Sequence, residues 1–359
     1  MNTELLPHMN PQNTATRAIL LINNPISADM SRMTLDADGI RPEEVTLITL
    51  RQTLRPWFDQ CRDVLHYPAA PSLRLTGQWR FLGFYWRAAR LLNRELRSPH
   101  LEEIYIVNND NLLTNHALAW RRQGGKARIT VISEGLMNYI DVQPRNRGAW
   151  RHRTKRLIAG SLGLLTHPVT GHLSGSFDPT VSRVISFVAA GLFAPQEKVV
   201  ILPFQPVTPS IPPQPNTLLY VETALWPWMP QEQWQPIARA FAAWIRQQNP
   251  SRLLVKEHPS YPACPLLRSL LPPFELLPKC QSIEEMAPNI EAAHVVGTCC
   301  TGLVTLRLIR PDLQISDFGA NRYIPAAYHN DFSVVHLMRE VGVRVVDCPG
   351  GEQPDAAIA

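Results

Sequence analysis

The sequence predicts an α/β protein made of two domains, each built around a parallel β-sheet. Strand-like and helix-like hydrophobic patterns alternate through the first half of the chain, a proline-rich run interrupts them at 203–215, and the alternation then restarts. The length of 359 residues agrees with two domains of ordinary size. Because 45% of the residues are hydrophobic and 18% are charged, the chain can bury a core, which excludes a largely disordered or fibrous protein.

In the first half, apolar runs with β-branched residues predict strands, and amphipathic runs predict helices. The long segment Gln78–Leu96 carries apolar residues at helical spacing with arginines between them. Gly124 and Gly125 mark the end of the next helix. The predicted elements are, in order, strands Ala18–Asn23 and Glu44–Leu50, helix Gln78–Leu96, strand Glu103–Val107, helix Leu112–Arg122 and strand Ala127–Ile132.

The run at 203–215 contains six prolines, which exclude a helix or a central strand and indicate a stiff, extended linker. We therefore predict a first domain over 1–205, a linker over 206–216 and a second domain over 217–359. The predicted elements of the second domain are strands Thr217–Val221, Arg252–Lys256, Phe274–Leu277, His294–Val296 and Leu313–Ile315, with helices Gln231–Gln248 and Leu303–Ile309. We expect a ligand in the cleft between the domains, at the carboxyl ends of the strands.

Charge and cysteine content narrow the class of protein. A net charge of +5 is compatible with an anionic substrate, and without an RRM, KH or helix-turn-helix signature we expect no nucleic-acid partner. A basic stretch at 143–156 without acidic residues is either a solvated helix face or a contact to an anionic membrane surface. The six scattered cysteines form neither a zinc-binding pattern nor a disulfide framework, so we expect no metal. With no secretory signal or long apolar run, a cytoplasmic protein is expected.

Three short motifs follow predicted strands, where an open α/β sheet presents its functional groups. The first is Ser133-Glu134-Gly135, after the strand that ends at Ile132. It places a carboxylate at a strand end, beside a glycine that lets the chain turn and a substrate approach. The alternative is an ordinary acid at the start of a helix or in a solvated loop.

The second motif is Lys256-Glu257-His258-Pro259. Pro259 restricts the backbone of His258 to extended or turn conformations, and a histidine directed in this way can protonate or hydrogen-bond a phosphate oxygen near neutral pH. The alternative is a structural histidine, and a second His-Pro pair at His167-Pro168 shows that the dipeptide also occurs by chance.

The third motif is the run from Gly297 to Leu303, GTCCTGL, which precedes a predicted helix. Its small residues, two hydroxyls and backbone N–H groups at a helix N-terminus can form an anion site. The alternative is a threonine helix cap among small packing residues. The lysine of a Walker A loop is absent.

Together, these three motifs resemble those of the bacterial sialyltransferase group of GT-B glycosyltransferases, in particular the polysialyltransferases of capsule synthesis and the lipooligosaccharide sialyltransferases. In those families an acidic pair followed by glycine supplies the general base, a His-Pro pair contacts the donor phosphate, and a Ser/Thr-rich motif holds it. The chain departs from this pattern at Ser133, which replaces the first acid, and at two cysteines that replace serines. By the resemblance the catalytic residues are Glu134 and His258, and the donor is held by Lys256, Pro259, Thr298, Cys299, Cys300 and Thr301.

The resemblance implies a GT-B fold of two Rossmann-like βα domains facing across a cleft, an acceptor side in the first domain and a donor side in the second. The implied reaction is an inverting, metal-independent transfer of sialic acid from CMP-sialic acid to an anionic or galactose-terminated glycan of a bacterial surface polysaccharide. It requires no cofactor, and it leaves open a peripheral contact with the inner membrane or the capsule-assembly machinery. Residues near strand ends either line the acceptor subsite or serve as caps and turns, namely Asn23, Asn24, Asn109, Asp110 and His116.

Two alternatives remain open at this point. Related capsule and lipopolysaccharide enzymes that use CMP-Kdo also carry a His-Pro motif, and both donor sugars have a carboxylate next to the anomeric carbon. The departures at Ser133 and at the cysteines also allow a non-catalytic glycan-binding protein that has kept the scaffold.

Overall fold

In the computed structural model the chain divides into two compact units. Unit 1 comprises Met1–Asn138, Val142–Ala189 and Phe193–Leu202, and unit 2 comprises Tyr139–Asp141, Ala190–Leu192 and Pro203–Ala359. The structure describes residues 15–51, 53–68, 75–109, 111–140, 156–168, 171–223, 230–258, 263–279, 281–319 and 334–348. Among these residues, no helix is long and apolar enough to cross a membrane.

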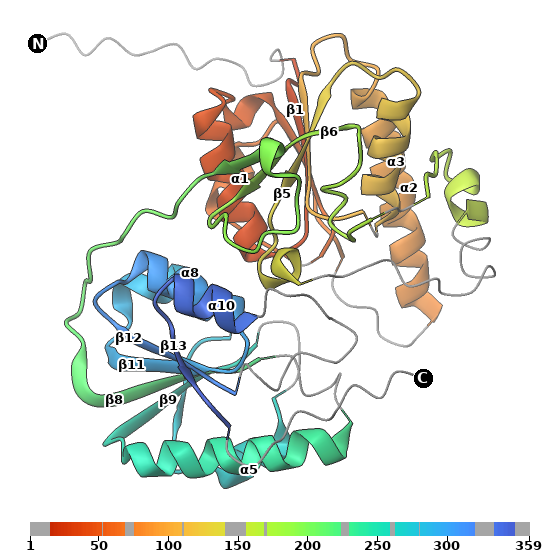
Figure 1. Cartoon of the computed structure of the whole chain (residues 1–359). Helices are drawn as coiled ribbons and strands as arrows, with labels where there is room; N and C mark the ends of the chain where they lie inside the picture. The colour runs from red at the N-terminus through yellow and green to blue at the C-terminus, as the bar shows by residue number, and fades with distance from the viewer. Residues whose placement is uncertain are drawn as a thin grey trace, which may run out of the picture. The chain divides into compact units, whose positions relative to one another are not determined.

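Unit 1 is a seven-stranded parallel sheet with helices on both faces. The strand order is β3-β2-β1-β4-β5-β6-β7. Helix α1 (Pro25–Ala37) lies on one face, and α2 (Leu75–Glu95) and α3 (Leu112–Arg122) lie on the other (Figure 1). The strands are β1 (Ala18–Ile22), β2 (Val45–Thr49), β3 (Asp63–Leu65), β4 (Glu103–Ile106), β5 (Arg128–Ile132), β6 (Val181–Ser186) and β7 (Val199–Ile201).

The central strands are buried on both faces, as expected of a parallel sheet covered by helices, and their sequences are accordingly continuous apolar runs. Their carboxyl ends coincide, since Ile22 pairs with Thr49 and Ile106 pairs with Val131. The predicted strands and helices of the first half are therefore confirmed. On α2 the buried side chains include Phe84, Ala88 and Leu92, whereas Phe81 and Tyr85 are half-buried.

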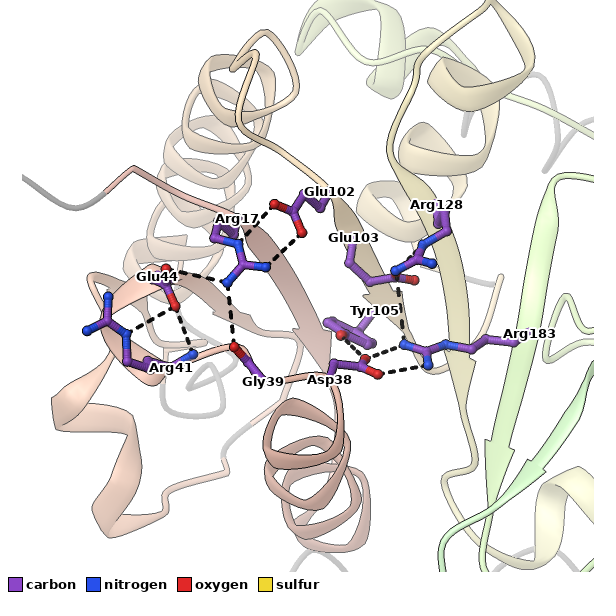
Figure 2. A network of polar contacts seen from close by, with 10 residues as sticks. All are labelled: Arg17, Asp38, Gly39, Arg41, Glu44, Glu102, Glu103, Tyr105, Arg128 and Arg183. Carbon is purple, nitrogen blue, oxygen red and sulfur yellow. Dashed lines mark hydrogen bonds and ion pairs between the residues drawn. The ribbon is translucent and has the colours of Figure 1, made fainter.

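A polar network crosses the opposite edge of this sheet, where the strands begin (Figure 2). The Asp38 carboxylate, at the end of α1, accepts hydrogen bonds from Tyr105 Oη at 2.5 Å and from Arg183 Nη1 at 2.9 Å. Glu103, the first residue of β4, accepts from Arg128 Nε at 2.8 Å and from Thr130 Oγ1 at 2.5 Å. This network ties α1 to three strands.

Unit 2 is a six-stranded parallel sheet in the order β10-β9-β8-β11-β12-β13. Its strands are β8 (Gln214–Val221), β9 (Arg252–Lys256), β10 (Glu275–Leu276), β11 (Ala292–Gly297), β12 (Gln314–Phe318) and β13 (Arg344–Val346). Its helices are α5 (Gln231–Gln248), α6 (Pro265–Leu270), α7 (Ile283–Met286), α8 (Thr301–Ile309) and α10 (Val334–Glu340). On α5, the centre of the Phe241 ring lies 5.0 Å from the ring centres of Tyr220 in β8 and Phe318 in β12. The apolar face of α5 therefore packs against the sheet.

The proline-rich segment runs along unit 2. Val207 N donates to Ile309 O at 2.9 Å, and Ser210 N donates to Pro288 O at 2.7 Å. Strand β8 begins at Gln214, inside the range predicted as linker. The segment thus has no regular secondary structure before Gln214, but the N–H groups of Val207 and Ser210 are hydrogen-bonded to unit 2.

Candidate functional site

Glu134 lies directly beyond β5, at the carboxyl edge of the unit 1 sheet. Ser133 N donates to Ile185 O at 2.9 Å, so the sheet pairing extends to the residue before it. Gly135 has a φ of 117°, a left-handed backbone that favours glycine and turns the chain away from the strand. Asn138 Oδ1 then accepts from Glu134 N at 2.9 Å. The turn therefore holds Glu134 half-buried at a defined place.

Three other amide side chains contact Glu134, from the ends of two neighbouring strands. Asn23, after β1, donates from Nδ2 to Glu134 Oε2 at 2.5 Å, and Asn108, after β4, donates to the same oxygen at 3.3 Å. Asn24 donates to Glu134 O at 3.0 Å while its own Oδ1 caps α1 by accepting from Ser27 N. Amide donors stabilise a carboxylate and fix its direction, which suits a general base.

Two other predicted acceptor residues of unit 1, Asn109 and His116, have hydrogen-bond partners outside the Glu134 cluster. Asn109 is buried and accepts from Asn115 Nδ2 at 2.9 Å. His116 is buried in α3, where Nδ1 accepts from Leu165 N at 2.8 Å and Nε2 lies 3.1 Å from Asn93 Oδ1. Burial lowers the pKa of His116 to about 4, so the ring is neutral. Both ring nitrogens are engaged within the unit, and we do not retain His116 in the site. Asp110 lies outside the described residues.

In unit 2 the register aligns the carboxyl ends of four strands. Val221 pairs with Lys256 and with Gly297, and Gly297 pairs with Asp317. Val221, Lys256 and Gly297 therefore lie side by side, and the residues that follow them, Glu222, Glu257 and Thr298, form a row at the carboxyl edge of the sheet. This row contains two of the three predicted motifs.

The His-Pro motif begins with Lys256, the last residue of β9. Lys256 is 2% exposed, and its Nζ donates to Glu257 O at 2.9 Å and to Lys279 O at 3.4 Å. Its ammonium thus joins one carbonyl of the motif, that of Glu257, to the chain at Lys279, a positioning contact. His258 is half-buried, two residues beyond β9, and Pro259 lies outside the described residues.

A charged cluster that the sequence analysis missed supports this loop. Arg268 of α6 donates to both carboxylate oxygens of Glu222, at 2.9 and 3.0 Å, and to Glu257 Oε1 at 2.8 Å. These hydrogen bonds raise the pKa of Arg268, since they stabilise its charged form. Glu222 follows a predicted strand, as Glu134 does, and that position was the signal that could have identified it.

The hydroxyl-rich turn begins where β11 ends. A Cβ at Gly297 would lie 3.0 Å from Val221 O, so the close approach of β8 requires glycine there. Cys299 has a φ of 47°, and its N–H donates to Asp317 Oδ2 at 2.6 Å. Thr298 is fully buried. The side chain of Asp317 thus fixes the turn by accepting a hydrogen bond from the turn's backbone. Asp317 was not identified from the sequence either.

Cys300 and Thr301 are the more exposed residues of the turn, at the N-terminus of α8. Burial raises the pKa of Cys300 to about 11, against the opposing effect of the Gly302 and Leu303 N–H groups, so Cys300 is a neutral thiol near pH 7. Cys300 is the N-cap of α8 and makes no side-chain capping hydrogen bond, and the backbone N–H groups of a first helical turn are donors that can bind an anion.

The described residues contain no group of three or more His, Cys, Asp or Glu side chains that could hold a metal ion. Of the basic stretch at 143–156, only Arg156 falls within them. The candidate residues thus belong to two sets, the Glu134 cluster in unit 1 and the Lys256–His258 and Thr298–Thr301 segments in unit 2.

Several solved structures resemble this chain. An α/β-galactoside α-2,3-sialyltransferase from the luminous marine bacterium Photobacterium phosphoreum is 10% identical, with 92% of this chain and 98% of that chain covered and a TM-score of 0.51. The glycosyltransferase SnogD from Streptomyces nogalater is 12% identical over 93% of this chain and 87% of that chain, with a TM-score of 0.46. A UDP-GlcNAc 2-epimerase from Neisseria meningitidis is 10% identical over 80% and 79%, with a TM-score of 0.41.

No protein-family model and no curated protein matches the sequence. At these identities a structural likeness speaks to the fold and leaves the reaction open. Two doubly wound parallel sheets in one chain, together with the likeness over 92% of it to the sialyltransferase structure, show that the protein has the α/β GT-B glycosyltransferase fold.

Proposed function

We propose that the protein is an inverting, metal-independent glycosyltransferase that moves sialic acid from CMP-sialic acid to a hydroxyl of a bacterial surface glycan. The observation that carries the proposal is the Glu134 carboxylate, held by Asn23 and Asn108 from two neighbouring strand ends at the edge where sheets of this kind bind ligands. The motif resemblance at Glu134, His258 and Thr298–Thr301 supplies the donor class.

In this proposal Glu134 is the general base. It removes the proton of the acceptor hydroxyl while the acceptor oxygen bonds to the anomeric carbon from the face opposite the leaving group. The bond between that carbon and the phosphate oxygen breaks, and CMP leaves with the electron pair. The amide donors of Asn23 and Asn108 hold the carboxylate in one orientation, so little reorganisation is needed during transfer.

Unit 2 binds the donor in this proposal. His258 donates a hydrogen bond or a proton to the departing phosphate, and the N-terminus of α8 at Thr301 faces the same charge. The carbonyl contacts of Lys256 and the Arg268 bridge to Glu257 fix the loop that carries His258. Because Cys300 is neutral near pH 7, it adds no negative charge beside the phosphate.

The test is CMP release by the full chain from CMP-sialic acid and, in parallel, from CMP-Kdo, with galactose-terminated and sialylated acceptors. We expect Glu134→Gln and His258→Ala each to lower turnover on the order of 10²–10³-fold. Matched controls are Glu43→Gln and His100→Ala, both exposed residues of unit 1, which are expected to keep wild-type turnover. Melting temperatures confirm that all variants fold.

Each outcome decides between the candidates. Release from CMP-sialic acid that is lost in both site variants supports the proposal. If CMP is released from CMP-Kdo but not from CMP-sialic acid, the donor is CMP-Kdo. If neither donor turns over but CMP, and not UDP, raises the melting temperature, the chain is a nucleotide-binding scaffold without transferase activity. If CMP has no effect either, the proposal is wrong.

A further inference from the structure

Helix α2 of unit 1 has a second apolar face, which points into solvent. Its buried side includes Phe84, Ala88 and Leu92, which pack within the unit. On the other side Leu82 and Trp86, one helical turn apart, are each 50% exposed. Exposed large apolar residues that are neighbours on a surface commonly mark an interaction site.

The same face is basic. Arg87 and Arg90 are exposed, and the Arg90 guanidinium lies 4.5 Å from the centre of the Trp86 ring, a cation–π contact. Glu95 is the one acidic residue in the sequence of α2, and it is buried and paired with Arg94 at 2.5 Å. The solvent face of α2 therefore combines apolar and positively charged groups.

A short helix at 156–161, whose following residues contact α2, carries exposed side chains of the same two kinds. Leu157 is 75% exposed and Ile158 is 42% exposed, whereas Ala159 is buried and holds the helix to the unit. Asn93 Nδ2 in α2 donates to Gly163 O at 3.4 Å, so the chain leaving this helix lies against α2. Arg156, at the start of the short helix, is also exposed. The apolar and basic pattern thus recurs on two adjoining elements.

We propose that this face is a docking surface for an anionic lipid bilayer. Trp86 and the three aliphatic side chains enter the boundary between headgroups and acyl chains, a depth that suits an amphipathic tryptophan. The arginines contact lipid phosphates, with Arg90 supported by the ring that it covers. The docking surface comprises Leu82, Trp86, Arg87, Arg90, Arg156, Leu157 and Ile158.

Charge favours a bilayer over a second copy of this chain. A two-fold symmetric interface would bring the same patch of each copy together and place arginines opposite arginines. The sequence of α2 offers only the buried, paired Glu95 to neutralise them, and the sequence of 156–165 offers no acid. An anionic membrane supplies the complementary charge to all of the arginines at once.

The test is co-sedimentation of the full chain with phosphatidylcholine vesicles that contain about 30% phosphatidylglycerol, against pure phosphatidylcholine, at low and high salt. We expect binding to the anionic vesicles that weakens with salt. Trp86→Ser combined with Leu157→Ser is expected to lower the partition coefficient about tenfold or more. Replacing Arg87 and Arg90 by alanine is expected to lower it about fivefold for each arginine.

The matched control is Leu276→Ser, because Leu276 in β10 is 54% exposed but belongs to unit 2. It should bind like the wild type. Binding that survives in the Trp86 and Leu157 variant would place the contact on another surface and overturn the proposal, as would absence of wild-type binding. A dimer in sedimentation velocity that this variant dissociates, without vesicle binding, would assign the face to a second copy. None of these outcomes depends on the donor sugar.

Discussion

The buried histidine of α3 makes the stability of unit 1 depend on pH. His116 is 2% exposed, and burial lowers its pKa to about 4, whereas an unfolded chain protonates histidine near 6.5. Below that value the unfolded state binds a proton that the folded state excludes, so stability falls as pH falls toward 4. Between pH 7.5 and 5.0 the expected loss from this residue is about 2 kcal/mol.

Urea unfolding of the wild type and of His116→Gln at these two pH values checks this expectation. Glutamine does not titrate, so the variant is expected to lose about 2 kcal/mol less stability than the wild type on acidification. An equal loss in both proteins would show that His116 is not the group responsible.

At the residue scale, the sequence predicts which residues follow a strand but not which side chains form hydrogen bonds with them. Glu134 and His258 were chosen as candidates because each follows a predicted strand, and in the structure Glu134 follows β5 and His258 follows β9. Asp317 and Arg268 were missed, because their contacts to Cys299 and Glu222 join residues 18 and 46 positions apart. His116 was included for its place near a strand end, but the periodicity of α3 turns its side chain inward.

Among the elements, α1 depends on the network at the amino edge of the sheet (Figure 2). Burial alone would raise the pKa of Asp38, but the hydrogen bonds from Arg183 and Tyr105 outweigh it and hold the pKa below its usual value. Asp38→Ala leaves the Arg183 guanidinium and the Tyr105 hydroxyl without this partner. We expect a loss of about 2–3 kcal/mol in the free energy of unfolding, measured by urea denaturation.

The matched variant for this measurement is Asp36→Ala. Asp36 lies two residues earlier and pairs with Arg32 at 3.0 Å, but its side chain is 57% exposed. Such a pair contributes little, so the change should stay below about 0.5 kcal/mol. Equal effects of the two substitutions would contradict a special role for Asp38.

The turn after β11 depends on a glycine that allows close contact with β8. A Cβ at Gly297 would lie 3.0 Å from Val221 O and 3.3 Å from a methyl group of Leu303, and a backbone oxygen in a sheet cannot move aside. Gly297→Ala is expected to lower the free energy of unfolding by about 1–3 kcal/mol. Gly83→Ala in α2, where a Cβ meets nothing within 4 Å, should be neutral or stabilising by up to about 1 kcal/mol. Chemical denaturation of both variants distinguishes the two cases, and a stable Gly297→Ala would show that the approach is looser than described.

Helices and strands could be predicted from the sequence where apolar residues recur at a regular spacing. The elements that were missed lack such a pattern. The buried face of α1 consists largely of small or polar residues, including Ser27, Ser31 and Thr34, so no apolar stripe marks this helix in the sequence. Strands β3, β7 and β13 have three residues each, too few for a period of two to be recognised. Strand β6 was missed although it is longer, since polar Ser182 and Arg183 interrupt its apolar run.

At the scale of the whole molecule, the two units repeat one topology. Each sheet reverses its strand order beside its first strand, between β1 and β4 in unit 1 and between β8 and β11 in unit 2. Ligands of open α/β sheets bind at such reversals, at the carboxyl ends of the strands. Asn23 and Asn108 flank the first reversal, and Glu222 and Thr298 flank the second. The α/β class and the two βα units could be predicted from the alternating pattern, because that pattern is all that the class requires.

In the function that we propose, the protein transfers a CMP-activated acidic sugar to a glycan with Glu134 as the base. The most direct measurement is the mass of galactose-terminated and sialylated acceptors after incubation of the full chain with CMP-sialic acid, because hydrolysis of the donor leaves an acceptor unchanged. We predict the addition of sialyl units by the wild type and by Glu43→Gln, and little or none by Glu134→Gln. Acceptors of unchanged mass, or equal transfer by Glu134→Gln, would contradict the account.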